Sequence, residues 1–125
     1  YTKYSYNAPK MSSKTFKQNQ AVTVTVEVTN SGEIDGEEIV QLYIRDKVSS
    51  ATRPVKELKG YQRVALKAGE TKTVSFTIDA ESLAFYDINM AYCVEPGEFM
   101  IMTGSSSNDK DLKSTTLEVN NRIEL

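Results

Sequence analysis

Hydrophobic and polar residues alternate along most of the chain. In residues 21–30, valine occupies every second position, and threonine or glutamate lies between. Successive side chains of a β-strand point to opposite faces, so this period of two predicts a strand with one buried face. Residues 37–46, 71–79 and 98–103 repeat the pattern. The inward positions predicted for these four segments are Val22, Val24, Val26, Val28, Val40, Leu42, Ile44, Val74, Phe76, Ile78, Phe99 and Ile101.

Turn-forming residues separate these segments. Asn30-Ser31-Gly32 and Asp35-Gly36 lie between the first two, and residues 67–70 are expected to form a hairpin loop before the strand at 71–79. An opening strand is expected to include residues 4–6 and to end near Met11. A strand at 115–119 closes the series. A period of 3.6 is not sustained anywhere. One helical turn at 80–83, capped by Asp79, is the only helix expected.

About seven or eight short strands joined by turns predict an all-β, immunoglobulin-like or fibronectin type III-like sandwich of antiparallel strands. The 125 residues suit one domain, residues 1–125, with a core of its own.

The formal net charge of −2 argues against nucleic-acid binding, which draws its affinity from basic surfaces. No apolar run approaches the roughly 18 residues of a membrane span, so no membrane partner is expected. The chain starts at Tyr1 without a signal peptide, which suggests a processed chain or an excised fragment.

Few residues suited to catalysis are present. The chain has no histidine, and its single cysteine, Cys93, is expected to be a small buried side chain of the core or of an interface. The glycine-containing turns match no nucleotide-binding motif, so no cofactor is expected. Paired carboxylates remain as a glycosidase option, but most of the 17 acids fall on outward faces or in turns, and a small sandwich has no deep cleft. Residues 108–111 are more typical of a solvated loop than of a calcium loop, because the glycine and terminal glutamate of an EF-hand are missing.

Tyrosines are the main candidates for a binding surface. Tyr4 and Tyr6 share one face of the opening strand, and Tyr43 lies on the less aliphatic face of residues 37–46, which is expected to be partly covered. Exposed rings could bind carbohydrate or another protein. The commoner arrangement is a tyrosine that covers a sheet edge with its hydroxyl in water.

Several motifs together resemble one family. They are Asn30-Ser31-Gly32, Gly36-Glu37-Glu38-Ile39-Val40-Gln41-Leu42-Tyr43, Arg53-Pro54-Val55-Lys56-Glu57-Leu58-Lys59-Gly60-Tyr61, Leu66-Lys67-Ala68-Gly69-Glu70, Ala84-Phe85-Tyr86-Asp87, Glu95-Pro96-Gly97-Glu98-Phe99 and Gly104-Ser105-Ser106-Ser107. In this order they resemble the C-terminal fibronectin type III-like domain of family 3 glycoside hydrolases, chiefly bacterial β-glucosidases. The resemblance implies upstream catalytic domains in the same polypeptide, holding both catalytic residues, with β-glucoside substrate near their active site. A periplasmic or secreted parent is favoured. The chain itself would be a non-catalytic accessory domain; the alternative is an independent carbohydrate-binding or extracellular protein-interaction module.

The connection at residues 47–56 is the best candidate for a contact with those domains. Arg53 and Pro54 are docking candidates, together with Tyr43, Tyr4 and Tyr6, because arginine offers a planar fork of donors and is enriched at interfaces. Lys56, Glu57 and Lys59 are expected instead to be charges that protect an edge strand from pairing with other chains. In that strand Leu58 is expected to turn inward.

Overall fold

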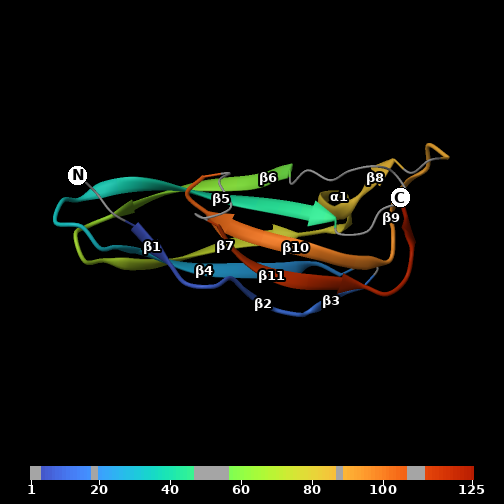
Figure 1. Cartoon of the computed structure of the whole chain (residues 1–125), viewed down its shortest axis with the longest axis horizontal. Coiled ribbons are helices and arrows are strands. Elements are labelled where there is room, and N and C mark those ends of the chain that lie inside the picture. The colour runs from blue at the N-terminus through green and yellow to red at the C-terminus, as the bar shows by residue number, and fades with distance from the viewer. Residues whose placement is uncertain (1–3, 18–19, 47–56, 87–88, 107–111) are drawn as a thin grey trace.

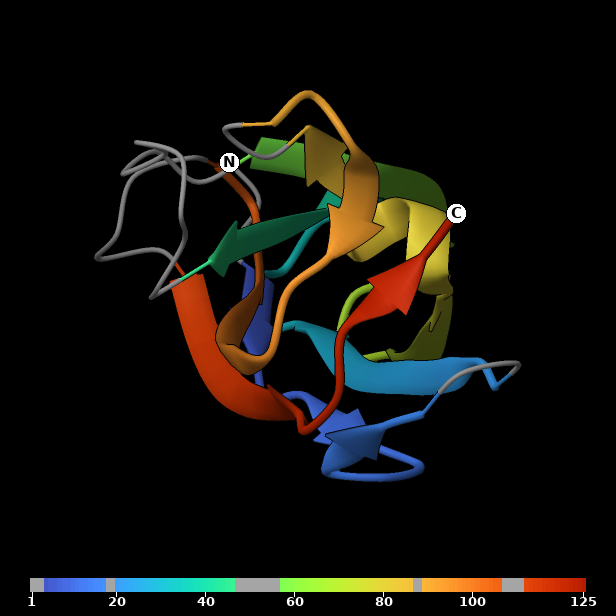
Figure 2. The same cartoon turned by 90° about the vertical axis from the view of Figure 1, so that its right-hand side faces the viewer.

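The long strands form two β-sheets that pack face to face (Figures 1 and 2). The computed structural model describes residues 4–17, 20–46, 57–86, 89–106 and 112–125. In the first sheet, β4 (Val22–Asn30) pairs with β7 (Thr71–Ile78) and with the short β1 (Tyr4–Tyr6) and β2 (Lys10–Met11). The second sheet has the order β3 (Thr15–Phe16), β11 (Leu112–Val119), β10 (Gly97–Gly104), β5 (Gly36–Asp46) and β6 (Glu57–Leu66). The predicted all-β sandwich is therefore confirmed.

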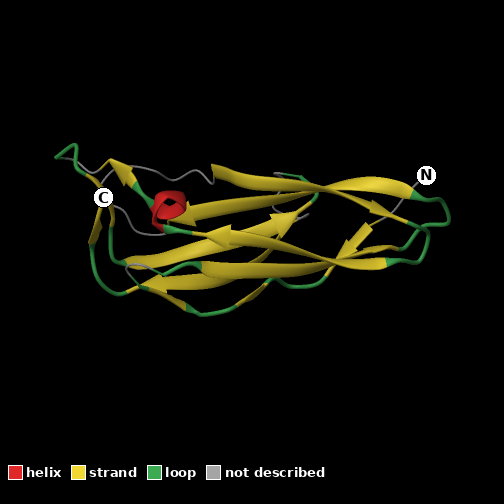
Figure 3. Cartoon of the chain, turned by 180° about the vertical axis from the view of Figure 1, so that it is seen from behind, coloured by secondary structure: helices red, strands yellow, loops and turns green. Residues whose placement is uncertain are grey.

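A third, small sheet lies at one end of the sandwich, beside the C-terminus. It has the order β12 (Ile123–Glu124), β9 (Tyr92–Val94) and β8 (Phe85–Tyr86). The helical turn α1 (Ala80–Leu83) is at this end too, drawn red in Figure 3. Its predicted cap is confirmed: the Asp79 carboxylate accepts a hydrogen bond from the Ser82 amide at 3.0 Å.

The core lies between the two large sheets, and all twelve predicted inward positions are buried. The other buried residues of the core are Phe16, Leu66, Leu83, Ala84, Val94, Leu117, Val119 and Ile123. Each fully buried Val, Leu, Ile or Phe side chain stabilises the fold by about 1.5–3 kcal/mol through transfer from water. Cys93 is fully buried, as predicted.

The strands are more numerous than the seven or eight predicted. Twelve occur in the described ranges, because β1, β2, β3, β8, β9 and β12 are segments of only two or three residues, too short to show alternation. One pairing differs from the antiparallel expectation, since β3 lies parallel to β11.

The hairpin expected at residues 67–70 is wrong. The strands before and after it, β6 and β7, belong to different large sheets, so this segment crosses the sandwich. Residues 31–35 likewise connect β4 in one sheet with β5 in the other. Gly69 makes the crossing turn possible because its φ of +81° is disfavoured for residues with a side chain.

Asn30 joins these two crossings. Its side chain is fully buried and donates to the carbonyls of Ile34 at 2.9 Å and Leu66 at 3.1 Å, while its Oδ1 accepts from the Gly32 amide at 3.0 Å. Its backbone pairs with Gly69 and Glu70. One polar residue therefore satisfies the backbone of both connections where water is excluded.

The inward orientation predicted for Leu58 is also wrong, and a β-bulge is the reason. Strand β6 pairs Gly60 with Leu42 but Leu58 with Tyr43, so Lys59 is an extra residue in the ladder. Gly60 faces the core, where a Cβ would come within 3.3 Å of the Phe76 ring. Because the extra residue reverses the faces of the residues that precede it in the chain, Leu58 does not share the core side with Gly60 but points outward and is 51% exposed.

Candidate docking surface

The two tyrosines of β1 are part of the sandwich. Tyr4 and Tyr6 share one face, as predicted, and both are half-buried against the core. The Tyr6 hydroxyl donates to Glu38 Oε2 at 2.9 Å and so links the first sheet to the second. Burial, followed by the hydrogen bond and negative charge of Glu38, raises the pKa of the Tyr6 phenol well above its ordinary value. These rings hold the sheets together more than they offer a flat, exposed platform.

Tyr43 is covered more fully than its position suggested. Its residue is only 8% exposed, and its hydroxyl donates to Gln41 Oε1 at 2.5 Å. Gln41 in turn donates through Nε2 to the Ser105 carbonyl at 3.1 Å. A sugar has little access to such a ring in the described structure. Arg53, Pro54 and Lys56 lie outside the described residues, so their predicted roles remain predictions.

The outer side of β5 and β6 carries the most apolar exposed surface of the two large sheets in the described structure. Three cross-strand pairs point outward here, namely Ile39 with Arg63, Gln41 with Tyr61, and Tyr43 with Leu58. Ile39 is 41% exposed and Tyr61 68% exposed. We call the surface formed by Ile39, Leu58 and Tyr61 the β5–β6 outer face. Strand β6 is at the edge of its sheet, as predicted, and Figure 1 shows it along the upper margin of the molecule.

Charges border this face. Arg63 Nε lies 3.6 Å from Glu37 Oε2, and Lys59 Nζ lies 3.3 Å from Glu57 Oε2. A centre of aromatic and aliphatic side chains with a charged rim is the usual composition of a protein interface. Sequence reasoning missed Tyr61 and Leu58 because it assumed an unbroken alternation in β6. Gly60 is the sequence feature that could have indicated the bulge, since glycine inside a strand often accompanies one.

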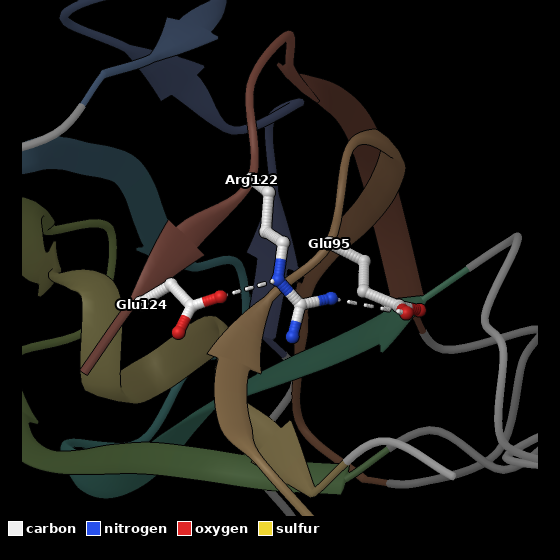
Figure 4. Close-up of polar contacts among 3 residues, drawn as sticks. All are labelled: Glu95, Arg122 and Glu124. Carbon is white, nitrogen blue, oxygen red and sulfur yellow. Dashed lines mark hydrogen bonds and ion pairs between the residues drawn. The ribbon is translucent and has the colours of Figure 1, made fainter. Parts of the chain in front are cut away.

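A cluster of three charged side chains, Glu95, Arg122 and Glu124, lies near the C-terminal end of the chain (Figure 4). Arg122 donates through Nε to Glu124 Oε1 at 2.9 Å, and its Nη1 lies 3.9 Å from Glu95 Oε2. The guanidinium therefore joins β12 to the residue that follows β9. Such partly exposed pairs contribute about 0–1 kcal/mol each, so the cluster mainly orients the small sheet.

One hollow in the described structure has carboxylates in its lining. A shallow hollow lined by Gln20, Ala21, Asp79, Ala80, Ile123, Glu124 and Leu125 contains two carboxylates. Asp79 caps α1 and Glu124 pairs with Arg122, so both already have structural partners. Within the described ranges, no three His, Cys, Asp or Glu side chains meet in a way that suits a metal ion, and no helix is long and apolar enough to cross a bilayer. The loop at 108–111 lies outside those ranges.

Comparison with known proteins identifies the domain. The family model described as "Fibronectin type III-like domain" matches residues 38–107. The chain is 44% identical over 119 residues to a β-xylosidase of Formosa agariphila and 43% identical over 126 residues to thermostable β-glucosidase B of Acetivibrio thermocellus. These alignments cover 95% and 100% of this chain but only 16% and 17% of the relatives.

Solved structures agree with the sequence relatives. A β-glucosidase from Listeria innocua, in complex with glucose, superposes with a TM-score of 0.87 and 34% identity over 97% of this chain and 16% of that chain. A β-glucosidase from Erythrobacter marinus superposes with the same TM-score at 36% identity, over 94% of this chain and 15% of that one. The chain thus spans about a sixth of these proteins, and it belongs to the family of fibronectin type III-like domains, as its motifs predicted.

Proposed function

We propose that this chain is the non-catalytic accessory domain of a family 3 glycoside hydrolase, and that it packs on and stabilises upstream catalytic domains which hydrolyse terminal β-glucosides. The observation that carries the proposal is its share of its relatives. Proteins named for β-glucosidase or β-xylosidase activity match 95–100% of this chain with about a sixth of their own length. The other five sixths leave ample room for separate catalytic domains.

The non-catalytic role is supported by the state of the acidic side chains. A glycosidase needs two free carboxyl groups about 5–9.5 Å apart in a cleft. In the hollow lined by Asp79 and Glu124, one carboxylate is committed to a helix cap and the other to Arg122. Glu38, the partly buried acid between the sheets, accepts the Tyr6 hydroxyl.

A rigid accessory domain benefits catalysis by restricting motion. Catalytic groups carried by two domains stay aligned only when those domains cannot rock, and a displacement of about 1 Å costs about 100-fold in rate. A sandwich with a continuous core, and with Asn30 and Tyr6 linking its sheets, is stiff enough to brace such a pair. Interfaces between domains of one chain bury about 600–1,500 Å², which the outer side of one sheet can supply.

The direct test is removal of residues 1–125 from the full-length polypeptide. We expect a lower melting temperature and a lower kcat/KM on an aryl β-glucoside, with an aryl β-xyloside assayed in parallel to define the sugar. The 125-residue chain by itself is expected to show no turnover on either substrate. Unchanged melting and unchanged kinetics after the deletion would contradict the proposal, and so would turnover by the isolated chain.

A further inference from the structure

The two large sheets expose surfaces of opposite character. The outer sides of β4 and β7 carry hydroxyl and charged residues, with Thr23, Thr25, Glu27, Thr73, Ser75 and Thr77 in successive outward positions. The corresponding side of β5 and β6 carries Ile39, Leu58 and Tyr61. In the described structure the outer side of β5 and β6 is thus the more apolar of the two, and it resembles the centre of a protein interface, where aromatic and apolar residues concentrate.

The apolar surface continues across the second sheet. Leu58 lies opposite Tyr43, and Tyr43 lies opposite Met102 on the neighbouring β10, so the three side chains form one row across three strands. Tyr43 and Met102 are already buried, whereas Leu58 at the edge is not. The row therefore ends in an exposed side chain that a partner would cover.

The bulge at Lys59 produces this arrangement. With regular pairing Leu58 would fall on the core side, in phase with Gly60, and would gain the free energy of burial. The extra residue instead places a leucine in water next to Tyr61. Bulges often redirect a side chain at functional sites, and here Leu58 joins Ile39 and Tyr61 in one exposed patch, which is the arrangement that marks interaction surfaces.

We infer that the β5–β6 outer face, centred on Leu58 and Tyr61, is the surface by which this domain docks on the catalytic domains of its own polypeptide. The inference rests on the proposed function and names the face that performs it. The occupant is the rest of the same chain because the domain makes up only about a sixth of its relatives' length, so most of each such polypeptide is available in cis at high effective concentration. Tyr61 and Arg63 are of the residue types that carry most binding energy at interfaces.

Site-specific thiol labelling of the full-length protein tests this. Cysteine is introduced singly as Leu58→Cys or Tyr61→Cys, and labelling by a maleimide is followed by mass spectrometry of the peptide concerned. Two control positions are used. Leu125→Cys is matched in residue type and exposure, 54% against 51% for Leu58, and Thr73→Cys reports the opposite sheet. The native Cys93 is fully buried and does not compete.

We expect labelling at positions 58 and 61 to be ~10-fold or more slower than at 125 and 73, independently of protein concentration, because only rare opening exposes a docked side chain. Fast labelling at 58 and 61 with protection at 73 or 125 would overturn the inference and leave the proposed function intact. Fast labelling at all four positions would also overturn the inference, and the deletion of residues 1–125 would then decide the proposed function separately. Protection of 58 and 61 that appears only at high protein concentration would assign the face to a second copy of the protein. Protection that appears only on adding soluble β-glucan would assign it to carbohydrate. Either result refutes docking in cis.

Discussion

Loss of the Asn30 side chain should unfold the domain more readily than loss of any surface side chain. In Asn30→Ala, three hydrogen bonds disappear, those to the Ile34 carbonyl, the Leu66 carbonyl and the Gly32 amide. Each contributes about 1 kcal/mol net, and the Leu66 carbonyl is left without this donor in a buried site, which adds about 1 kcal/mol or more. We therefore expect the free energy of unfolding to fall by about 3–4 kcal/mol, a large part of the 5–15 kcal/mol typical of a domain.

Urea denaturation of the 125-residue chain, followed by far-UV circular dichroism, measures this change as a lower midpoint at an unchanged m-value. Asn30→Asp separates shape from hydrogen bonding. It keeps the acceptor for Gly32 but removes both donors and directs a carboxylate at two carbonyls, so it should destabilise at least as much as alanine. Asn121→Ala, an exposed asparagine, is the control and should change stability by less than about 0.5 kcal/mol. A loss below about 1 kcal/mol in Asn30→Ala would refute the idea that this residue holds the two crossings together.

Three further substitutions test other local features. Tyr6→Phe should cost about 1–2 kcal/mol through the lost bond to Glu38. Because the pKa of Tyr6 is higher in the folded state, its contribution to stability is complete below the unfolded-state pKa near 10 and declines as the pH rises above that value. Urea midpoints measured between pH 8 and 11 should therefore fall more for wild type than for Tyr6→Phe. Thr103→Val should raise the melting temperature, since it removes a fully buried hydroxyl that has no hydrogen-bond partner among the described residues and gains about 1 kcal/mol; a lower melting temperature would contradict this. Asp79→Ala should lower the free energy of unfolding by about 1 kcal/mol through loss of the α1 cap, as measured by urea denaturation. Asp79→Asn, which keeps an acceptor, should recover most of this loss.

A role of Leu58 and Tyr61 in docking can be separated from a role in folding by comparing the isolated chain with the full-length protein. Core residues such as Asn30 stabilise the isolated chain, whereas Leu58 and Tyr61 are exposed in it. Changing either of these two to serine should leave the free energy of unfolding of the isolated chain within about 0.5 kcal/mol of wild type. An effect of these two substitutions that appears only in the full-length protein separates a role between domains from a role within this one.

The alternation of residue types was sufficient to predict the sandwich and its main core. Side-chain direction in a strand follows from the backbone alone, so Val22, Val24, Val26 and Val28 had to share a face once the segment was extended. The cap at Asp79 is equally local, because its partner Ser82 is three residues away. Burial of Cys93 followed from the chemistry of a lone thiol in an apolar segment.

Long-range pairing decided what the sequence by itself left undetermined. Whether residues 67–70 turn back within one sheet or cross to the other depends on the partner of β7, and that partner is β4, more than 40 residues earlier. Asn30 acquires its importance only when Ile34 and Leu66 are brought to it from two connections. The outward turn of Leu58 depends on how β6 aligns with β5, since a single extra residue at Lys59 reverses the faces of the strand beyond it. Alternation specifies faces within one unbroken strand, and only the neighbouring strand determines where that alternation is interrupted.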